Sequence, residues 1–193
     1  MTVAAGGSTK TAEVVRVVAC FYTPQTALVV IDMLNDFVLE GAPLEVPAAR
    51  GIITHIAGAV ARAKQDGAPV VYLCDTHDPD DREFRNWPRH CVRGTQGAEV
   101  VQPLRGQETV RVPKTRYSGF FRSDLEAALN RLGVKTLVLS GLLTDICVYF
   151  TAADAYMRDY TVAVLKDGVA ALSLEDHQWA LRQMERLFKA ALV

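Results

Sequence analysis

Short runs of apolar residues alternate with longer amphipathic segments from residue 26 to the end of this 193-residue chain. The first run, Ala27-Leu-Val-Val-Ile31, is continuous and rich in β-branched residues, which is typical of a strand buried on both faces. Strands that alternate with helices at this spacing form βαβ units, which build a parallel sheet covered by helices. The sequence therefore predicts an α/β fold with three layers, α/β/α, around a mostly parallel sheet of five to six strands.

The expected elements follow from these patterns and from the Gly and Pro residues between them. We expect strands over residues 27–31, 69–74, 109–113, 136–140 and 161–165, with a short last strand within 190–193. We expect helices over residues 48–65, 123–132, 147–158 and 174–189, the last one capped by Ser173. Strand 109–113 alternates apolar and polar residues, which predicts a position near an edge of the sheet.

Residues 1–25 begin rich in Gly, Ser and Thr, and we interpret them as an N-terminal extension to a single domain over residues 26–193. The formal net charge of -1, from 21 basic and 22 acidic side chains, gives no basic face for nucleic acid. No apolar run approaches the length of a membrane span. The four cysteines lack paired spacing, so free thiols in a reducing cytoplasm are expected.

A lone cysteine, Cys147, follows the strand 136–140 after one short turn. Thr144 is placed to cap the helix that begins there, and Asp145 lies in its first turn. At a helix N-terminus a thiol loses its proton more readily and becomes a nucleophile. The alternative is a small apolar core residue, which is the commonest role of a free cysteine.

Polar side chains stand at the carboxyl ends of four predicted strands, where ligands bind in open α/β sheets. These residues are Asp32, Asp75, Lys114 and, after the fourth strand, Cys147. On one rim, Asp32 can take the thiol proton and Lys114 can stabilise the thiolate. A strand-end aspartate can instead cap a turn, and Lys114 can be a solvated charge. Taken together, the four positions predict a nucleophilic site.

The segment from Asp75 to about Gln107 shows no sustained helical or strand period, which in a compact domain favours a functional loop. Its imidazoles and carboxylates form a ligand set that suits Zn, Mn or Fe: Asp75, His77, Glu83 and His90. The spacing does not match a closed structural-zinc pattern, so coordination positions open to water or substrate are expected. The alternative is that the two histidines make ordinary hydrogen bonds within the loop.

Three aromatic residues can supply flat walls to a pocket beside these groups: Phe37, Trp87 and Tyr117. For each of them taken alone, packing in the core is the alternative.

Three segments resemble, in order, the signatures of the isochorismatase-like cysteine hydrolases. They are Val30-Ile-Asp-Met-Leu-Asn-Asp-Phe37, Lys114-Thr-Arg-Tyr-Ser-Gly-Phe120 and Gly141-Leu-Leu-Thr-Asp-Ile-Cys-Val148. The likeness continues in Thr151-Ala-Ala-Asp-Ala155 and covers residues 26–193. The loop pattern Asp75-x-His77, then Trp87-Pro-x-His90-Cys91, is most similar to that of the nicotinamidases and pyrazinamidases.

The resemblance implies a catalytic triad of Asp32, Lys114 and Cys147. It implies an oxyanion hole made by the backbone N–H groups of Leu143 and Cys147, next to a cis peptide bond between Leu142 and Leu143. It assigns the walls of the substrate pocket to Phe37, Trp87 and Tyr117.

The resemblance also implies a bound divalent metal ion, expected to be zinc with manganese or iron as alternatives. The ligands that match are Asp75, His77 and His90, and Glu83 fits the place of a fourth ligand in one subgroup. Many family members carry a further histidine soon after the Asp-x-His pair. Residues 78–83 stand in its place here, so the fourth ligand stays open.

The implied activity is hydrolysis of nicotinamide to nicotinate and ammonia through a cysteine thioester, as in NAD salvage, with the metal holding the pyridine ring. The first alternative is a metal-independent cysteine hydrolase of another small amide, of the carbamoyl or ureido type. The second is a non-catalytic small-molecule binding or oligomerisation module on the same fold. Members of the family commonly form oligomers, so a cytoplasmic homo-oligomer is expected.

Overall fold

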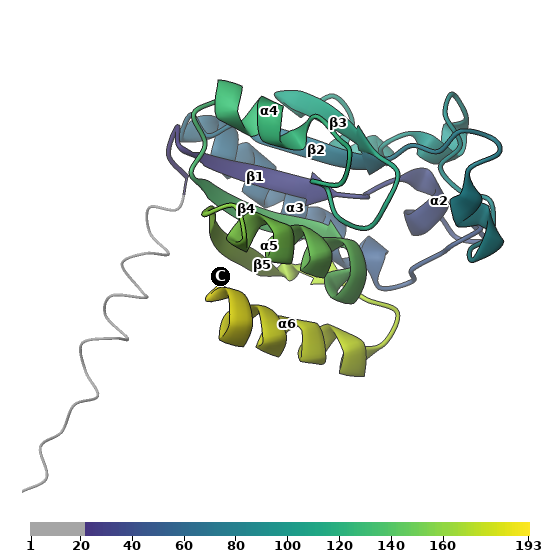
Figure 1. Ribbon diagram of the computed structural model, residues 1–193. Coiled ribbons are helices and arrows are strands. Elements are labelled where there is room, and N and C mark those ends of the chain that lie inside the picture. The colour runs from purple at the N-terminus through teal and green to yellow at the C-terminus, as the bar shows by residue number, and fades with distance from the viewer. Residues whose placement is uncertain (1–21) are drawn as a thin grey trace, which may run out of the picture.

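The computed structural model describes residues 22–193 (Figure 1). The predicted extension, residues 1–25, lies almost entirely outside the described residues.

The centre of the fold is a six-stranded sheet in which every pair of neighbouring strands is parallel. The strand order is β3-β2-β1-β4-β5-β6, so the alternating β3 lies at an edge, as predicted. The strands are β1 (Thr26–Ile31), β2 (Val70–Asp75), β3 (Val110–Lys114), β4 (Thr136–Leu142), β5 (Thr161–Ala170) and β6 (Ala191–Leu192). The predicted parallel sheet is therefore confirmed, and β5 runs five residues beyond its expected end.

Helices cover both faces of the sheet (Figure 1). The helix α3 lies behind the sheet in this view, and α4, α5 and α6 lie in front of it. The helices are α2 (Asn35–Val38), α3 (Ala49–Gln65), α4 (Leu125–Arg131), α5 (Tyr149–Tyr156) and α6 (Leu174–Phe188). The predicted three-layer α/β/α architecture is confirmed.

Two separate apolar cores explain this layering, because successive side chains of a strand point to opposite faces. On β1, Leu28 and Val30 pack in the core that includes Ile56 of α3. Their neighbour Val29 packs in the other core, which includes Leu129 of α4. Both faces of the strand are buried, as its continuous apolar sequence predicts.

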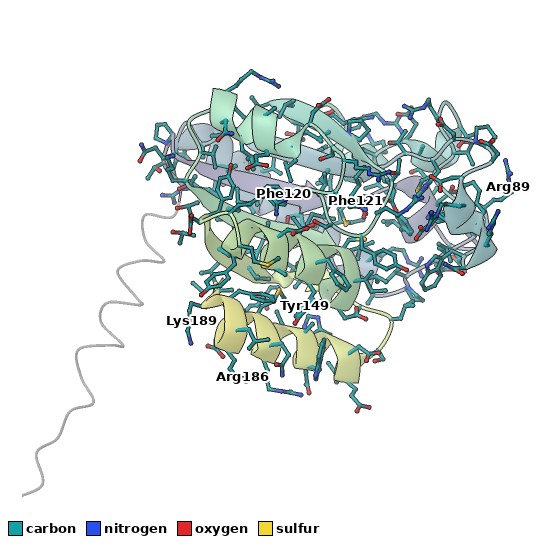
Figure 2. The ribbon with its side chains drawn as sticks, viewed as in Figure 1. Arg89, Phe120, Phe121, Tyr149, Arg186 and Lys189 are labelled. Atoms are coloured by element: carbon teal, nitrogen blue, oxygen red, sulfur yellow. The ribbon has the colours of Figure 1, made fainter. Side chains whose placement is uncertain are left out.

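The helix α6 begins where the sequence indicates, since the Ser173 hydroxyl accepts a hydrogen bond from the Asp176 N–H at 3.1 Å. Tyr149 fills the seam between α5 and α6 (Figure 2), where its ring stacks against Trp179 and Phe188. None of the helices within residues 22–193 is both long and apolar enough to cross a membrane.

The segment between β2 and β3 forms no long helix or strand. It contains only three short 3-10 helices, Arg82–Arg85, Gln96–Ala98 and Gln102–Leu104. It extends beyond the carboxyl ends of the strands beside α2 (Figure 1), and Arg89 stands at its outer side (Figure 2). We refer to residues 75–107 as the metal loop, because the sequence predicts metal ligands in this segment.

Candidate active site

Three side chains predicted at strand ends meet around one ammonium group. The Lys114 Nζ lies 2.7 Å from Asp32 Oδ2 and 3.4 Å from Cys147 Sγ. Asp32 directly follows β1, Lys114 ends β3, and Cys147 follows β4. We refer to Asp32, Lys114 and Cys147 as the strand-end triad. The structure brings the three together on one rim, and each of them is buried.

The topology of the sheet explains why they meet. The strand order reverses between β1 and β4, and ligands of doubly wound sheets bind in the crevice at such a point. Gly141 makes the close approach of the two strands possible, because a Cβ atom there would lie 2.0 Å from the Ile31 carbonyl oxygen. Its φ of 100° also favours glycine. Asp32 has a φ of 53°, a strained conformation for a residue with a side chain.

A second carboxylate, Asp75, closes the buried charge cluster. Its Oδ1 lies 2.5 Å from Lys114 Nζ, and its backbone N–H donates to Asp32 Oδ1 at 2.8 Å. Lys114 therefore stands between two acids and is 1% exposed. Burial would lower the pKa of Lys114, but Asp32 and Asp75 hold it well above its usual value. The lysine is thus a fixed positive charge.

The two carboxylates differ in acidity. Burial raises the pKa of Asp32 to about 6; the charge of Asp75 adds to this effect, and the charge and hydrogen bond of Lys114 oppose it without reversing it. Burial would also raise the pKa of Asp75, but the Lys114 charge and the nearby imidazoles of His77 and His90 hold it well below its usual value. Near neutral pH, Asp32 is therefore the carboxyl group of the pair that can exchange a proton.

The thiol of Cys147 is not acidified, so the predicted effect of the helix N-terminus is wrong. Burial raises the pKa of Cys147 well above its usual value, and the Lys114 charge opposes this without reversing it. The carboxylates of Asp32 and Asp75 raise the pKa further, in part through a hydrogen bond between the thiol and Asp32. The raised pKa favours the thiol form of Cys147, and the hydrogen bond to Asp32 joins that thiol to a base that could remove its proton.

The turn that carries Cys147 also differs from expectation. It is a π-helical turn, Thr144–Val148, which continues into α5. The N-cap position is occupied by Leu143, and the predicted cap by Thr144 is wrong, since that hydroxyl instead lies 2.9 Å from His177 Nδ1. His177 begins the second turn of α6, so this contact ties α6 to the turn.

The expected cis peptide bond between Leu142 and Leu143 is also wrong, since the described residues contain no cis peptide bond. Leu143 is extended, and its carbonyl oxygen accepts the N–H groups of Ile146 and Val148, each at 3.1 Å. A trans bond therefore closes this turn, and trans is the lower-energy form of a non-proline peptide by about 3–4 kcal/mol.

A possible metal site adjoins the triad. One ligand atom each from Asp75, His77 and His90 lie within 4.8 Å of one another, and all three residues are buried. The Nε2 atoms of His77 and His90 lie 3.6 and 3.7 Å from Asp75 Oδ2. The Nε2 of His77 is buried without a hydrogen-bond partner, which a bound cation would supply. Two imidazoles and one carboxylate suit zinc or iron with open positions, so these residues fit a metal ion.

Glu83 lies outside this group of three. Its Oε2 is 3.5 Å from Nε of Arg116, so the carboxylate is drawn to a guanidinium rather than to the histidines. Glu83 does line the same pocket.

The metal loop is fastened to the rest of the fold by hydrogen bonds. The Asp36 carboxylate of α2 accepts the Cys91 N–H at 2.7 Å, and the Cys91 carbonyl accepts the His77 N–H at 3.0 Å. The Asn35 side chain donates to the Gln96 carbonyl at 2.7 Å. The irregular backbone around the two histidines is therefore held by side chains of α2.

A pocket of about 250 Å³ opens above these groups. The three predicted aromatic residues all line it, and Trp87 Nε1 donates to the Tyr117 hydroxyl at 3.0 Å. Apolar side chains such as Leu143, Ile146 and Leu172 complete the wall. The lining contains four carboxylates and no Lys or Arg: Asp32, Glu45, Asp75 and Glu83. The pocket therefore combines a thiol, a possible metal site and flat apolar walls.

Comparison with known proteins identifies the family. The sequence model of the isochorismatase domain family matches residues 26–192 of this chain. The chain belongs to the isochorismatase family. Among its relatives is a probable inactive nicotinamidase of Arabidopsis thaliana, which is 34% identical over 84% of this chain and 89% of that protein.

Solved structures of the isochorismatase family share this fold closely. A pyrazinamidase of Pyrococcus horikoshii in complex with zinc is 36% identical, with a TM-score of 0.82 over 88% of this chain and 99% of that one. An N-carbamoylsarcosine amidase of Thermoplasma acidophilum is also 36% identical, with a TM-score of 0.79 over 87% of this chain and 95% of that one.

Sequence reasoning missed several side chains that support the site in this isochorismatase-family chain. Asp36 binds the Cys91 N–H of the metal loop, and His177 contacts Thr144 in the turn of Cys147. Asp81 contacts His77 directly, and Arg116 contacts Asp81. A single sequence carries no signal for such pairs, since the Asp36–Cys91 and Asp81–Arg116 partners lie 55 and 35 residues apart.

Proposed function

We propose that this protein is a nicotinamidase that hydrolyses nicotinamide to nicotinate and ammonia through a thioester on Cys147. The observation that carries the proposal is that Cys147 and Asp32 both contact Lys114. The same pocket adjoins the cluster of Asp75, His77 and His90. A thiol, a base and a fixed cation are the parts required for nucleophilic hydrolysis of an amide. The likeness to a pyrazinamidase structure with zinc supports the same activity.

The lining of the pocket favours a neutral ring amide as the substrate. Aromatic walls from Phe37, Trp87 and Tyr117 suit a flat heterocycle. Carbamoyl and ureido acids carry a carboxylate, but the pocket lining contains no Lys or Arg, and the buried Lys114 is already paired with Asp32 and Asp75. A neutral carboxamide needs no cationic partner.

The metal ion would be held by Asp75, His77 and His90, and it would supply a Lewis acid that binds the ring nitrogen. The protein residues then perform the chemistry. Asp32 takes the proton from Cys147 as the sulfur bonds to the carboxamide carbon. The backbone N–H groups of Leu143 and Cys147 are proposed to stabilise the oxyanion, and each such donor typically lowers the barrier by about 3 kcal/mol.

Collapse of the tetrahedral intermediate breaks the carbon–nitrogen bond. The proton held by Asp32 passes to the departing nitrogen, which leaves as ammonia. Water then attacks the thioester while Asp32 accepts its proton, and the acid product and free thiol form as Asp32 returns that proton to the sulfur. Lys114 holds Asp32 beside the sulfur at every stage.

The second candidate function is hydrolysis of a carbamoyl compound, which the likeness to N-carbamoylsarcosine amidase favours. Ammonia release from nicotinamide, pyrazinamide, N-carbamoylsarcosine and an uncharged ureido compound separates the two candidates. Each substrate is measured with zinc-loaded and with chelator-treated protein. We expect nicotinamide and pyrazinamide to be hydrolysed and the activity to be lost in chelator. Chelator-resistant hydrolysis of the carbamoyl compound alone contradicts the proposal.

A homo-oligomer in the cytoplasm remains part of the same proposal. Light scattering on the purified protein tests the assembly, and a mass equal to a single chain contradicts it.

A further inference from the structure

A chain of polar contacts runs from Arg116 to the possible metal ligand His77. The Arg116 Nη1 lies 3.0 Å from Asp81 Oδ1, and the Asp81 Oδ2 lies 3.0 Å from His77 Nδ1. Arg116 follows β3, Asp81 precedes the 3-10 helix Arg82–Arg85, and His77 follows β2. Three separate segments therefore converge on the far side of the ligand from the metal site.

These contacts determine which ring nitrogen of His77 carries the hydrogen and which can bind a metal ion. A carboxylate paired with a guanidinium is an acceptor only, so the Nδ1 of His77 must carry the hydrogen. The lone pair then lies on Nε2, the atom that is buried without a hydrogen-bond partner and faces Asp75 and His90. Asp81 thus presents His77 in the tautomer that a metal ion requires.

His90 is held differently. Its Nδ1 lies 2.7 Å from the carbonyl oxygen of Pro88, a neutral acceptor in its own loop. Of the two histidines, only His77 has a carboxylate at its Nδ1. A charged acceptor at this atom both orients the imidazole and raises its basicity toward a metal ion.

We propose that Asp81 is a positioning residue for the metal centre, which orients His77 and strengthens its bond to the metal, and that Arg116 holds Asp81 in place. This inference rests on the metal centre of the proposed function. It assigns a role outside the cluster of three ligands to two residues: Asp81 contacts the imidazole of His77, and Arg116 contacts Asp81.

The test is the zinc dissociation constant of the Asp81→Asn variant, measured by competition with a chromophoric chelator. The amide keeps the size of the side chain and an oxygen for the Glu83 N–H, which Asp81 Oδ1 accepts at 2.9 Å. The matched control is Asp78→Asn, an exposed aspartate of the same loop that pairs with Arg93 at 3.1 Å. We expect zinc to bind Asp81→Asn about 10–100-fold more weakly and Asp78→Asn as tightly as the parent.

The visible absorption spectrum of the cobalt-loaded protein is a second measurement, and a general loss of stability does not shift its bands. We expect the visible absorption bands of the cobalt-loaded protein to shift in Asp81→Asn, because the imidazole of His77 is reoriented, and to be unchanged in Asp78→Asn. Asp81→Glu retains the charge and should recover part of the zinc affinity. Arg116→Gln keeps Asp81 but removes its ion pair with the guanidinium. The zinc affinity of this variant should fall between those of the parent and Asp81→Asn.

Zinc affinity within twofold of the parent in both Asp81→Asn and Arg116→Gln overturns the inference, as does an equal loss in Asp78→Asn. Because the readout is metal binding, it stands apart from the choice of substrate. A protein whose zinc affinity depends on Asp81 but which leaves nicotinamide intact supports this inference and contradicts the proposed activity.

Discussion

The strand-end triad and the metal loop line one pocket but are built in different ways. Asp32 directly follows β1, Lys114 ends β3 and Cys147 lies in the turn after β4, so the parallel sheet brings the three together. The histidines stand on irregular backbone, which is held in shape by hydrogen bonds from side chains such as Asp36. The sheet positions the reacting groups and the ligand Asp75, whereas hydrogen bonds within and to the loop position the two histidines. Changes in the two regions should therefore affect chemistry and metal binding separately.

The largest effect is expected for Cys147→Ala, which removes the nucleophile and leaves the pocket wall in place. We predict a fall in kcat of at least about 10⁴-fold, since nucleophile and base act as one unit. Zinc affinity should be unchanged, because Cys147 is not part of the cluster of three ligand residues. Ammonia release and chelator competition measure the two quantities. Retention of full amidase activity would show that Cys147 is not the nucleophile.

Replacement of Lys114 tests the electrostatic side of the triad. In Lys114→Met, the carboxylates of Asp32 and Asp75 lose the charge that lies 2.7 and 2.5 Å away in a buried site. Breaking a buried ion pair typically costs about 3–5 kcal/mol of unfolding free energy. Urea unfolding measures the loss, and Lys135→Met at an exposed position is the control. Equal stability of the two variants would mean that one carboxyl group already binds a proton in the native protein.

The difference between the strand-end triad and the metal loop also determines how much of the molecule the sequence predicts. The buried strands carry their own signal, because the apolar run 27–31 is continuous and Asp32 directly follows it. Strand ends of a parallel sheet share one edge, so the meeting of Asp32 with Lys114 follows from the strand assignment.

Local patterns do not predict the contacts that cross the chain. The sequence shows that His77 and His90 lie in an irregular segment, but not that Asp81 and Arg116 contact His77 there. The acidity of Cys147 was predicted wrongly for the same reason, because the burial and the two carboxylates that raise its pKa depend on the whole fold.

Gly97→Ala tests whether the metal loop depends on its fastening to α2. A Cβ atom at Gly97 would lie 2.1 Å from Asp36 Oδ2, the oxygen that accepts the Cys91 N–H. Displacement of Asp36 should weaken zinc binding about tenfold through the neighbouring His90, and overpacking should cost about 1–3 kcal/mol.

The control for this change is Gly58→Ala in α3, where a Cβ atom meets nothing within 4 Å. That variant should be slightly more stable than the parent, because alanine favours a helix over glycine. If Gly97→Ala binds zinc as tightly as Gly58→Ala, the loop holds its histidines without Asp36.

The smallest effect expected is the pH dependence of the reaction, which belongs to the triad. Burial raises the pKa of Asp32 to about 6, and Asp32 must be ionised to accept the thiol proton. Between pH 7 and pH 5 the ionised fraction falls, so kcat/KM should fall about tenfold. Loss of metal at low pH would produce a similar fall through the histidines, so zinc content is measured at each pH in a zinc-buffered assay. With full zinc occupancy at pH 5, a tenfold fall assigns the titration to the strand-end triad. A flat profile under the same occupancy means that the pKa of the base lies below 5, in which case Lys114 rather than burial determines the acidity of Asp32.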